Sequence, residues 1–145
     1  MILDKFKLDN EIVVITGGAG LLGRRYAKAL LEVGAVVILF DINKGALEDV
    51  KKLYNDYGNK LLTFVVDITK EESVQNAMLS IHDKLSQYPT ILINNAAIDP
   101  KFEKNSKINK SRLENFELSQ WNIELSVGLS GAMICTKIFG TQMAK

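Results

Sequence analysis

The residues best suited to chemistry in this sequence are the glycines of "TGGAGLLG", residues 16–23. They fit two spacings: Gly18, Gly20 and Gly23 give G-x-G-x-x-G, whereas Gly17, Gly20 and Gly23 give G-x-x-G-x-x-G. At the start of a helix, free backbone N–H groups and the positive end of the helix dipole attract a phosphate. Glycines suit such a loop because a β-carbon would hold the phosphate away. The loop therefore predicts a pyrophosphate site, whose candidate residues are Gly17, Gly20, Leu21, Leu22 and Gly23.

A carboxylate follows the next apolar run, "AVVILF", at Asp41, 18 residues after Gly23. In a dinucleotide-binding unit, an acid at this strand end accepts hydrogen bonds from both adenosine ribose hydroxyls and repels a 2′-phosphate. We therefore expect Asp41 and its neighbour Ile42 to bind the ribose, with NAD preferred to NADP. Arg24 and Arg25 argue the other way, because a basic residue near the loop could pair with a 2′-phosphate. In the alternative interpretation Asp41 is a solvated acid and the loop is an ordinary strand–helix turn.

The elements that position these residues alternate between apolar runs and segments of helical spacing. Strands are predicted over residues 11–16, 35–40, 61–66 and 90–93, and helices over about 21–33 and 44–57. Thr69 and Glu72 predict a capping box that opens a third helix. Residues 98–118 read as a long polar loop, and helical spacing returns from about Ser119 to the end. This order predicts one α/β domain over residues 1–145, a doubly wound parallel sheet of Rossmann type with strand order 3-2-1-4.

Composition narrows the class of protein. The chain has 145 residues, 47% of them hydrophobic, and a formal net charge of +1, which gives no reason to expect nucleic acid or an anionic membrane as partner. From the acidic residues of its first ten positions we expect no signal peptide, and the sequence has no uninterrupted apolar run of about 20 residues. Its one cysteine, Cys135, is expected to be a plain buried thiol. A cytoplasmic location follows as an expectation. His82, the only histidine, fits a half-buried structural role, and no metal-ligand cluster is present.

The motifs and their order resemble those of the short-chain dehydrogenase/reductase family. "TGGAGLLG" looks like its cofactor loop, "FDIN" like its ribose-binding strand end, "VVDIT" (65–69) like its adenine-contacting strand end, and "NNAA" (94–97) is similar to its N-N-A-G. "SVGLSGAMICTK" (126–137) resembles the helix that usually reads V-N-L-x-G. The resemblance covers essentially the whole chain. It implies that Asp67 accepts from the adenine amine, Ile68 packs near the ring, Asn95 and Ala96 follow the nicotinamide ribose, and Asn94 ties the fourth strand to its neighbours. A cap acid before the next helix is the alternative for Asp67.

The family transfers a hydride between nicotinamide and an alcohol or carbonyl substrate, using a Ser and a Tyr-x-x-x-Lys pair. No tyrosine of this chain has a lysine four residues later, and Gly128 stands where the family's helix Asn is expected. Gly128 either keeps the helix locally open, leaving a backbone carbonyl free to hold a water, or allows close packing together with Gly131. We expect no catalytic residue in this chain and interpret it as the N-terminal, cofactor-binding part of a longer enzyme.

Three functions remain open from the sequence. The first is an NAD-dependent oxidoreductase acting on a small alcohol or carbonyl compound, with a sugar derivative as one option. It would form a homo-oligomer through the closing helix, as the resemblance implies. The second is an extended-type nucleotide-sugar epimerase or dehydratase, to which the spacing of Gly17, Gly20 and Gly23 points. The third is a module that binds NAD without turnover. The basic loop "KFEKNSKINKSR" (101–112) could attract a phosphorylated substrate, or be a solvated loop.

Overall fold

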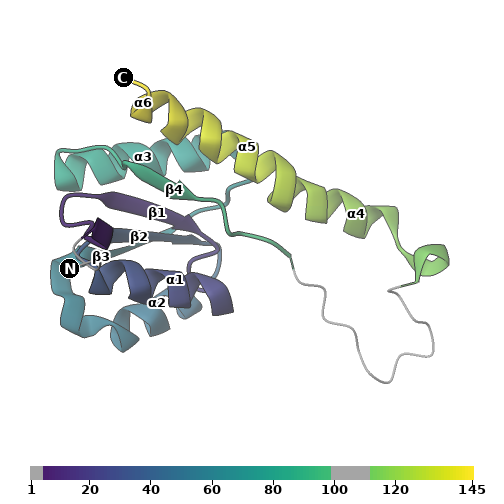
Figure 1. Ribbon diagram of the computed structural model, residues 1–145. Coiled ribbons are helices and arrows are strands. Elements are labelled where there is room, and N and C mark those ends of the chain that lie inside the picture. The colour runs from purple at the N-terminus through teal and green to yellow at the C-terminus, as the bar shows by residue number, and fades with distance from the viewer. Residues whose placement is uncertain (1–4, 99–111) are drawn as a thin grey trace.

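A computed structural model describes residues 5–98 and 112–145, and its centre is a four-stranded parallel sheet (Figure 1). The strands are β1 (Ile12–Thr16), β2 (Val36–Asp41), β3 (Leu61–Val65) and β4 (Ile91–Ile93), in the order β3-β2-β1-β4. This confirms the predicted fold and strand order. In the register, Thr16 pairs with Phe40 and Phe40 with Phe64, so the carboxyl ends of the strands lie along one edge of the sheet.

The strands are mostly apolar because both faces of the sheet are covered; their polar residues are Thr16, Asp41 and Thr63. Alternate residues of β1 belong to different cores: Ile12 and Val14 to one, Val13 and Ile15 to the other. Helices α1 (Leu21–Glu32) and α2 (Lys44–Leu53) cover the second face. Helix α3 (Glu71–Leu85) and the long closing helix cover the first, as Figure 1 shows.

Two helix boundaries differ from the sequence prediction. Helix α2 ends at Leu53 rather than near residue 57, and a 3₁₀ segment (Asn55–Lys60) follows. Tyr54 directly follows α2, and its hydroxyl donates to the Arg24 carbonyl at 3.1 Å, which ties the end of α2 to α1. The predicted capping box is wrong: α3 begins at Glu71, and no side chain caps its first turn. Lys70, not Thr69, occupies the position before the helix, and the Thr69 hydroxyl faces the Asp67 carboxylate, to which it donates.

The closing helix is continuous over 26 residues, Leu118–Met143. It consists of α4 (Leu118–Leu125), a π-helical segment (Ser126–Gly131), α5 (Ala132–Cys135), a second π-helical segment (Thr136–Gly140) and α6 (Thr141–Met143). Its C-terminal half lies over α3 and buries Cys135 and Phe139 in the core, whereas α4 projects past the sheet (Figure 1). Burial raises the pKa of the Cys135 thiol to about 11, so this is the plain buried thiol that the sequence predicted.

By length and composition, the closing helix is also apolar enough to cross a membrane, with a mean hydropathy of 1.3 over its best window. No such segment was expected from the sequence, because no apolar run in it is unbroken over about 20 residues. Polar residues interrupt the apolar residues of this helix, but its mean hydropathy stays high enough for a membrane span. Because Gly131, Cys135, Ile138 and Phe139 are buried against the domain, this half of the helix is part of the core.

Candidate dinucleotide site

A cavity of about 760 Å³ opens at the carboxyl ends of the strands. Its size is typical of a site for a cofactor or small molecule. Residues that follow β1, β2, β3 and β4 all line it, together with the closing helix. Ten of the eleven residues predicted for cofactor binding lie on its wall: Gly17, Gly20, Leu21, Leu22, Asp41, Ile42, Asp67, Ile68, Asn95 and Ala96. Four separate sequence motifs are thus brought to one site.

The eleventh predicted residue, Gly23, does not lie on the wall but packs beneath the loop. A β-carbon on Gly23 would be 2.4 Å from the Gly17 carbonyl oxygen, so only glycine lets helix α1 approach the loop this closely. Gly17 has a φ of +62° and lies under Ala96, whose Cα would be 2.9 Å from an added β-carbon. The left-handed backbone therefore occurs at the first glycine of the G-x-x-G-x-x-G spacing.

The N-terminus of α1 faces the cavity, and no side chain of the first turn offsets the partial positive charge of the helix dipole there. Gly20 precedes the helix, no side chain caps it, and its first turn contains no acidic residue. Leu21 and Leu22 in that turn are 81% and 57% exposed. Uncapped N–H groups at the positive end of a helix dipole form a ready anion site, which is the arrangement a pyrophosphate requires.

Asp41 joins the end of β2 to the glycine loop. One carboxylate oxygen, Oδ2, accepts from the Ala19 N–H at 3.1 Å, and Oδ1 accepts from the Asn43 N–H at 3.0 Å. These two bonds fix the orientation of a half-buried carboxylate on the cavity wall. A carboxylate has about four lone-pair positions, so both oxygens retain acceptor capacity toward the cavity. Ile42, next to it, is 70% exposed, an apolar surface at the mouth of the site.

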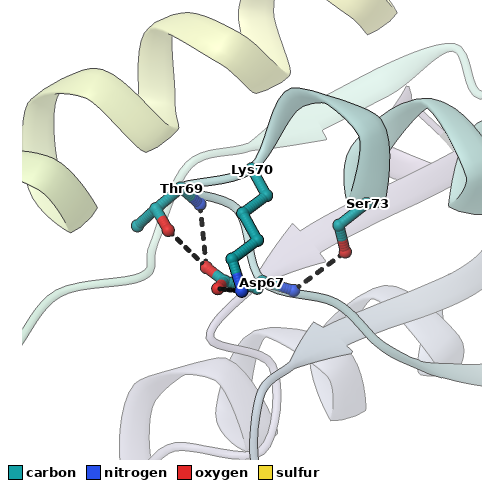
Figure 2. A network of polar contacts seen from close by, with 4 residues as sticks. All are labelled: Asp67, Thr69, Lys70 and Ser73. Carbon is teal, nitrogen blue, oxygen red and sulfur yellow. Dashed lines mark hydrogen bonds and ion pairs between the residues drawn. The ribbon is translucent and has the colours of Figure 1, made fainter.

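Asp67 forms a tight polar turn at the end of β3, shown in Figure 2. Its Oδ1 accepts from the Thr69 hydroxyl at 2.6 Å and from the Thr69 N–H at 3.1 Å, and Lys70 Nζ lies 3.2 Å from Oδ2. The Asp67 N–H donates to the Ser73 hydroxyl at 3.1 Å. The hydrogen bond from Thr69 is the main cause that lowers the pKa of this carboxyl below its ordinary value. These contacts are those of an acid that organises the turn before α3; contact with an adenine amine stays a prediction.

The end of β4 is held by a residue that sequence reasoning missed, Thr16. Its hydroxyl, 1% exposed, accepts from the N–H groups of Asn95 and Ala96, both at 3.0 Å. The Asn95 side chain donates back to the carbonyls of Thr16 and Gly17. Asn95, not Asn94, therefore ties the fourth strand to the first, and Asn94 donates instead to Thr136 on the closing helix. The position of Thr16, directly before the glycines, was the available signal.

The closing helix supplies one wall of the cavity through Ile123, Ser126 and Val127, which the sequence analysis did not assign. The signal for Ser126 and Val127 was the resemblance of residues 126–137 to a family helix, which does not include Ile123. Gly128 itself does not line the cavity, and a β-carbon on it would meet nothing within 4 Å. Close packing therefore does not explain Gly128. It does explain Gly131, where a β-carbon would be 2.7 Å from Ile68 Cδ1. The segment around Gly128 is π-helical, and water binding at a free carbonyl there stays a prediction.

Other candidate groups lie away from this cavity. His82 is half-buried and stacks on Tyr88 with ring centroids 4.4 Å apart, in keeping with the structural role predicted for it. Among residues 5–98 and 112–145, no group of three His, Cys, Asp or Glu side chains is placed to hold a metal ion. The basic loop at 101–112 falls outside the described residues, apart from Arg112.

The family model and the similar proteins all belong to one family of dehydrogenases. The family model described as short chain dehydrogenase matches residues 11–145. A short chain dehydrogenase/reductase of Gibberella zeae is 35% identical over 131 residues, which are 90% of this chain and 45% of that protein. The chain spans about half the length of the curated relatives it matches.

Two solved structures illustrate the likeness in fold. The gluconate 5-dehydrogenase from Burkholderia cenocepacia, in complex with NADP and tartrate, has a TM-score of 0.81 and 25% identity, covering 99% of this chain and 52% of that one. An NAD⁺-bound xylitol dehydrogenase also has a TM-score of 0.81 and 25% identity, covering 94% and 50%.

Proposed function

The chain belongs to the short-chain dehydrogenase family, and on that premise we propose that the whole protein is an NAD-dependent oxidoreductase. It transfers a hydride between the nicotinamide and the carbon of a small alcohol or carbonyl compound. The observation that carries the proposal is the single cavity on which the uncapped α1 N-terminus, Asp41 and the Asn95–Ala96 turn all lie.

The residues present fit a dinucleotide in size and in chemistry. The glycine loop leaves space at a helix N-terminus, where backbone N–H groups bind the pyrophosphate. Asp41 accepts from the adenosine ribose hydroxyls with the lone pairs that Ala19 and Asn43 do not use. When bound, the nicotinamide supplies or receives the hydride. The chain itself binds and orients the cofactor and covers one side of it with the closing helix.

NAD is proposed over NADP because a half-buried carboxylate at Asp41 would repel a 2′-phosphate. The related structures described above were solved with NAD⁺ in one case and NADP in the other, so family membership leaves this choice to the residues of the site. Asp41 lies on the cavity wall, fixed by two backbone N–H groups.

A polyhydroxylated compound, such as a sugar acid or a polyol, is the substrate class we propose. Gluconate and xylitol, named for the two related structures, are both of this kind. The proton-transfer pair expected of the family is not among these 145 residues, since no tyrosine is followed four positions later by a lysine. Substrate chemistry therefore depends on residues other than the ones described here.

Dinucleotide binding by the purified whole protein tests the proposal, measured by calorimetric titration with NAD and NADP. We expect NAD to bind more tightly, and Asp41→Ala to weaken NAD by about tenfold while reducing the preference over NADP, since hydrogen bonds to a charged group are worth about 1.5–3 kcal/mol. Asp49→Ala on the exposed side of α2 is the control for the change of charge. Failure of the wild-type protein to bind either dinucleotide would contradict the proposal.

A homo-oligomer formed through the closing helix, in the cytoplasm, completes the proposal. Its support is the apolar exposed side of that helix, which includes Trp121, Leu129 and Met133 at 50%, 65% and 58% exposure. Such a side is typical of a surface that another protein or a membrane covers.

A further inference from the structure

We propose that Arg24 is a positioning residue for the ribose end of the dinucleotide site, and that its charge moderates the preference for NAD over NADP. This inference rests on the proposed function and adds to it a residue that does not line the cavity. The starting observation is a chain of hydrogen bonds that links Arg24 to Asp41 through a single loop residue, Ala19.

The first link is between the Arg24 side chain and the loop. Arg24 Nε donates to the Ala19 carbonyl oxygen at 2.7 Å, a short bond in which the donor is charged. Ala19 is 5% exposed, so its carbonyl is poorly reached by water and would lose its partner if the guanidinium were removed. Leaving such an acceptor unpaired is unfavourable, and the loop would shift to avoid it.

The second link is between the same loop residue and the ribose-binding carboxylate. The Ala19 N–H donates to Asp41 Oδ2 at 3.1 Å, so Ala19 is held on its carbonyl side by Arg24 and on its N–H side by Asp41. The neighbouring Gly18 N–H donates to the Phe40 carbonyl at 2.9 Å, which anchors the loop to β2 but not the carboxylate. Arg24 therefore fixes the orientation of Asp41 at a distance of two hydrogen bonds.

The positive charge of Arg24 also acts on the site. Arg24 is half-buried at the start of α1, and its backbone carbonyl is itself held by the Tyr54 hydroxyl at 3.1 Å. The guanidinium, two hydrogen bonds away from Asp41, offsets part of the repulsion between that carboxylate and a 2′-phosphate. Removing the charge should therefore weaken NADP binding more than NAD binding, because only NADP carries the extra phosphate.

The neighbouring Arg25 provides a matched control. It carries the same charge on the same turn of α1, its side chain is exposed, and within the described part of the chain no hydrogen bond or ion pair involves its guanidinium. Two substitutions separate the roles of the hydrogen bond and the charge. Arg24→Met removes both. Arg24→Gln removes the charge but keeps an N–H donor the same number of bonds from Cα as the arginine Nε.

The experiment is titration of the whole protein and its variants with NAD and with NADP, after thermal unfolding has confirmed that each is folded. We expect Arg24→Met to weaken NAD by about tenfold and Arg24→Gln to recover most of that loss. Arg24→Gln, which keeps the hydrogen bond and removes only the charge, should weaken NADP by about two- to fivefold more than NAD. Arg25→Met and Arg25→Gln should match the wild type with both cofactors.

The proposal is overturned if Arg24→Met and Arg25→Met give the same affinities, or if the ratio of NAD to NADP affinity in Arg24→Gln equals that of the wild type. Should Arg24→Met fail to fold, the ratio in Arg24→Gln decides alone. These results differ from failure of the proposed function, in which the wild-type protein would bind neither dinucleotide.

Discussion

At the scale of single residues, the Thr16 hydroxyl connects two strands that are not joined by any hairpin. It accepts from two backbone N–H groups of the turn after β4 while lying at the end of β1. Thr16→Val keeps the volume but leaves both N–H groups unpaired in a buried place. We expect a loss of about 2 kcal/mol or more in the free energy of unfolding.

Chemical denaturation measures this loss, with Thr63→Val on β3 as the control. The Thr63 hydroxyl makes no hydrogen bond within residues 5–98 and 112–145, so its replacement should change stability by less than about 0.5 kcal/mol. Equal effects at the two positions would show that the Thr16 hydroxyl does not clamp the strands.

Asp67 gives a prediction about pH. Its pKa is lowered in the folded protein, chiefly by the Thr69 hydroxyl, from an ordinary value of 3.8. A carboxyl with a lowered folded pKa stabilises the protein above its unfolded pKa, and that contribution is lost as the pH falls through the folded value. Asp67→Asn should therefore cost about 1 kcal/mol at pH 7, and the difference from the wild type should shrink steadily below pH 3.8.

Urea denaturation at a series of pH values from neutral to acid checks this prediction. Asp83→Asn, an exposed position near the end of α3, is the matched substitution and should show no such dependence. A constant difference between Asp67→Asn and wild type across the series would mean that the ionised carboxylate contributes nothing to the turn.

At the scale of elements, the two glycines of the π-helical segment should respond oppositely to alanine. Gly128 has open space where a β-carbon would be, so Gly128→Ala should stabilise the helix by about 0.5–1 kcal/mol. At Gly131 the added carbon would be 2.7 Å from Ile68 Cδ1, and Ile68 is a buried wall residue of the cavity. Gly131→Ala should destabilise by about 1–3 kcal/mol. Melting curves compare the two, and a shift of the same sign in both would contradict the packing argument.

An element could be predicted where the residues within it determine its structure, and not where a contact with another side chain decides it. The strands were predictable because "IVVIT" and "VVILF" are buried on both faces and so are apolar at every position but Thr16. The start of α3 was not, because Thr69 belongs to the turn around Asp67, to which its N–H and hydroxyl donate, and Lys70 precedes the helix instead. Most of the candidate site could be predicted, since its residues follow directly on the strands. The role of Thr16 was missed because its partners, the N–H groups of Asn95 and Ala96, lie 79 and 80 residues further along the chain.

At the scale of the whole molecule, the closing helix has two different sides. One packs on the sheet through Cys135, Ile138 and Phe139. The other carries Trp121, Leu125, Leu129 and Met133 at intervals of four residues, all at least 38% exposed. Residues four apart are neighbours on one helix face, so these side chains form a continuous apolar ridge. A second copy of the chain and a lipid bilayer are the two surfaces that would cover such a ridge.

Charged substitutions on the ridge distinguish between a second copy of the chain and a lipid bilayer as its partner. Leu129→Glu combined with Met133→Glu should convert the proposed homo-oligomer of the whole protein to single subunits, because two carboxylates would be buried without partners at the interface. Light scattering after size exclusion measures the mass, and Leu53→Glu, an equally exposed leucine on α2, is the control. If the protein instead requires detergent and sediments with membranes until the ridge is charged, the ridge contacts lipid and the homo-oligomer is contradicted. We expect the wild type to remain in solution, because burying Gly131, Cys135 and Phe139 in the domain leaves only one side of this helix free for a partner.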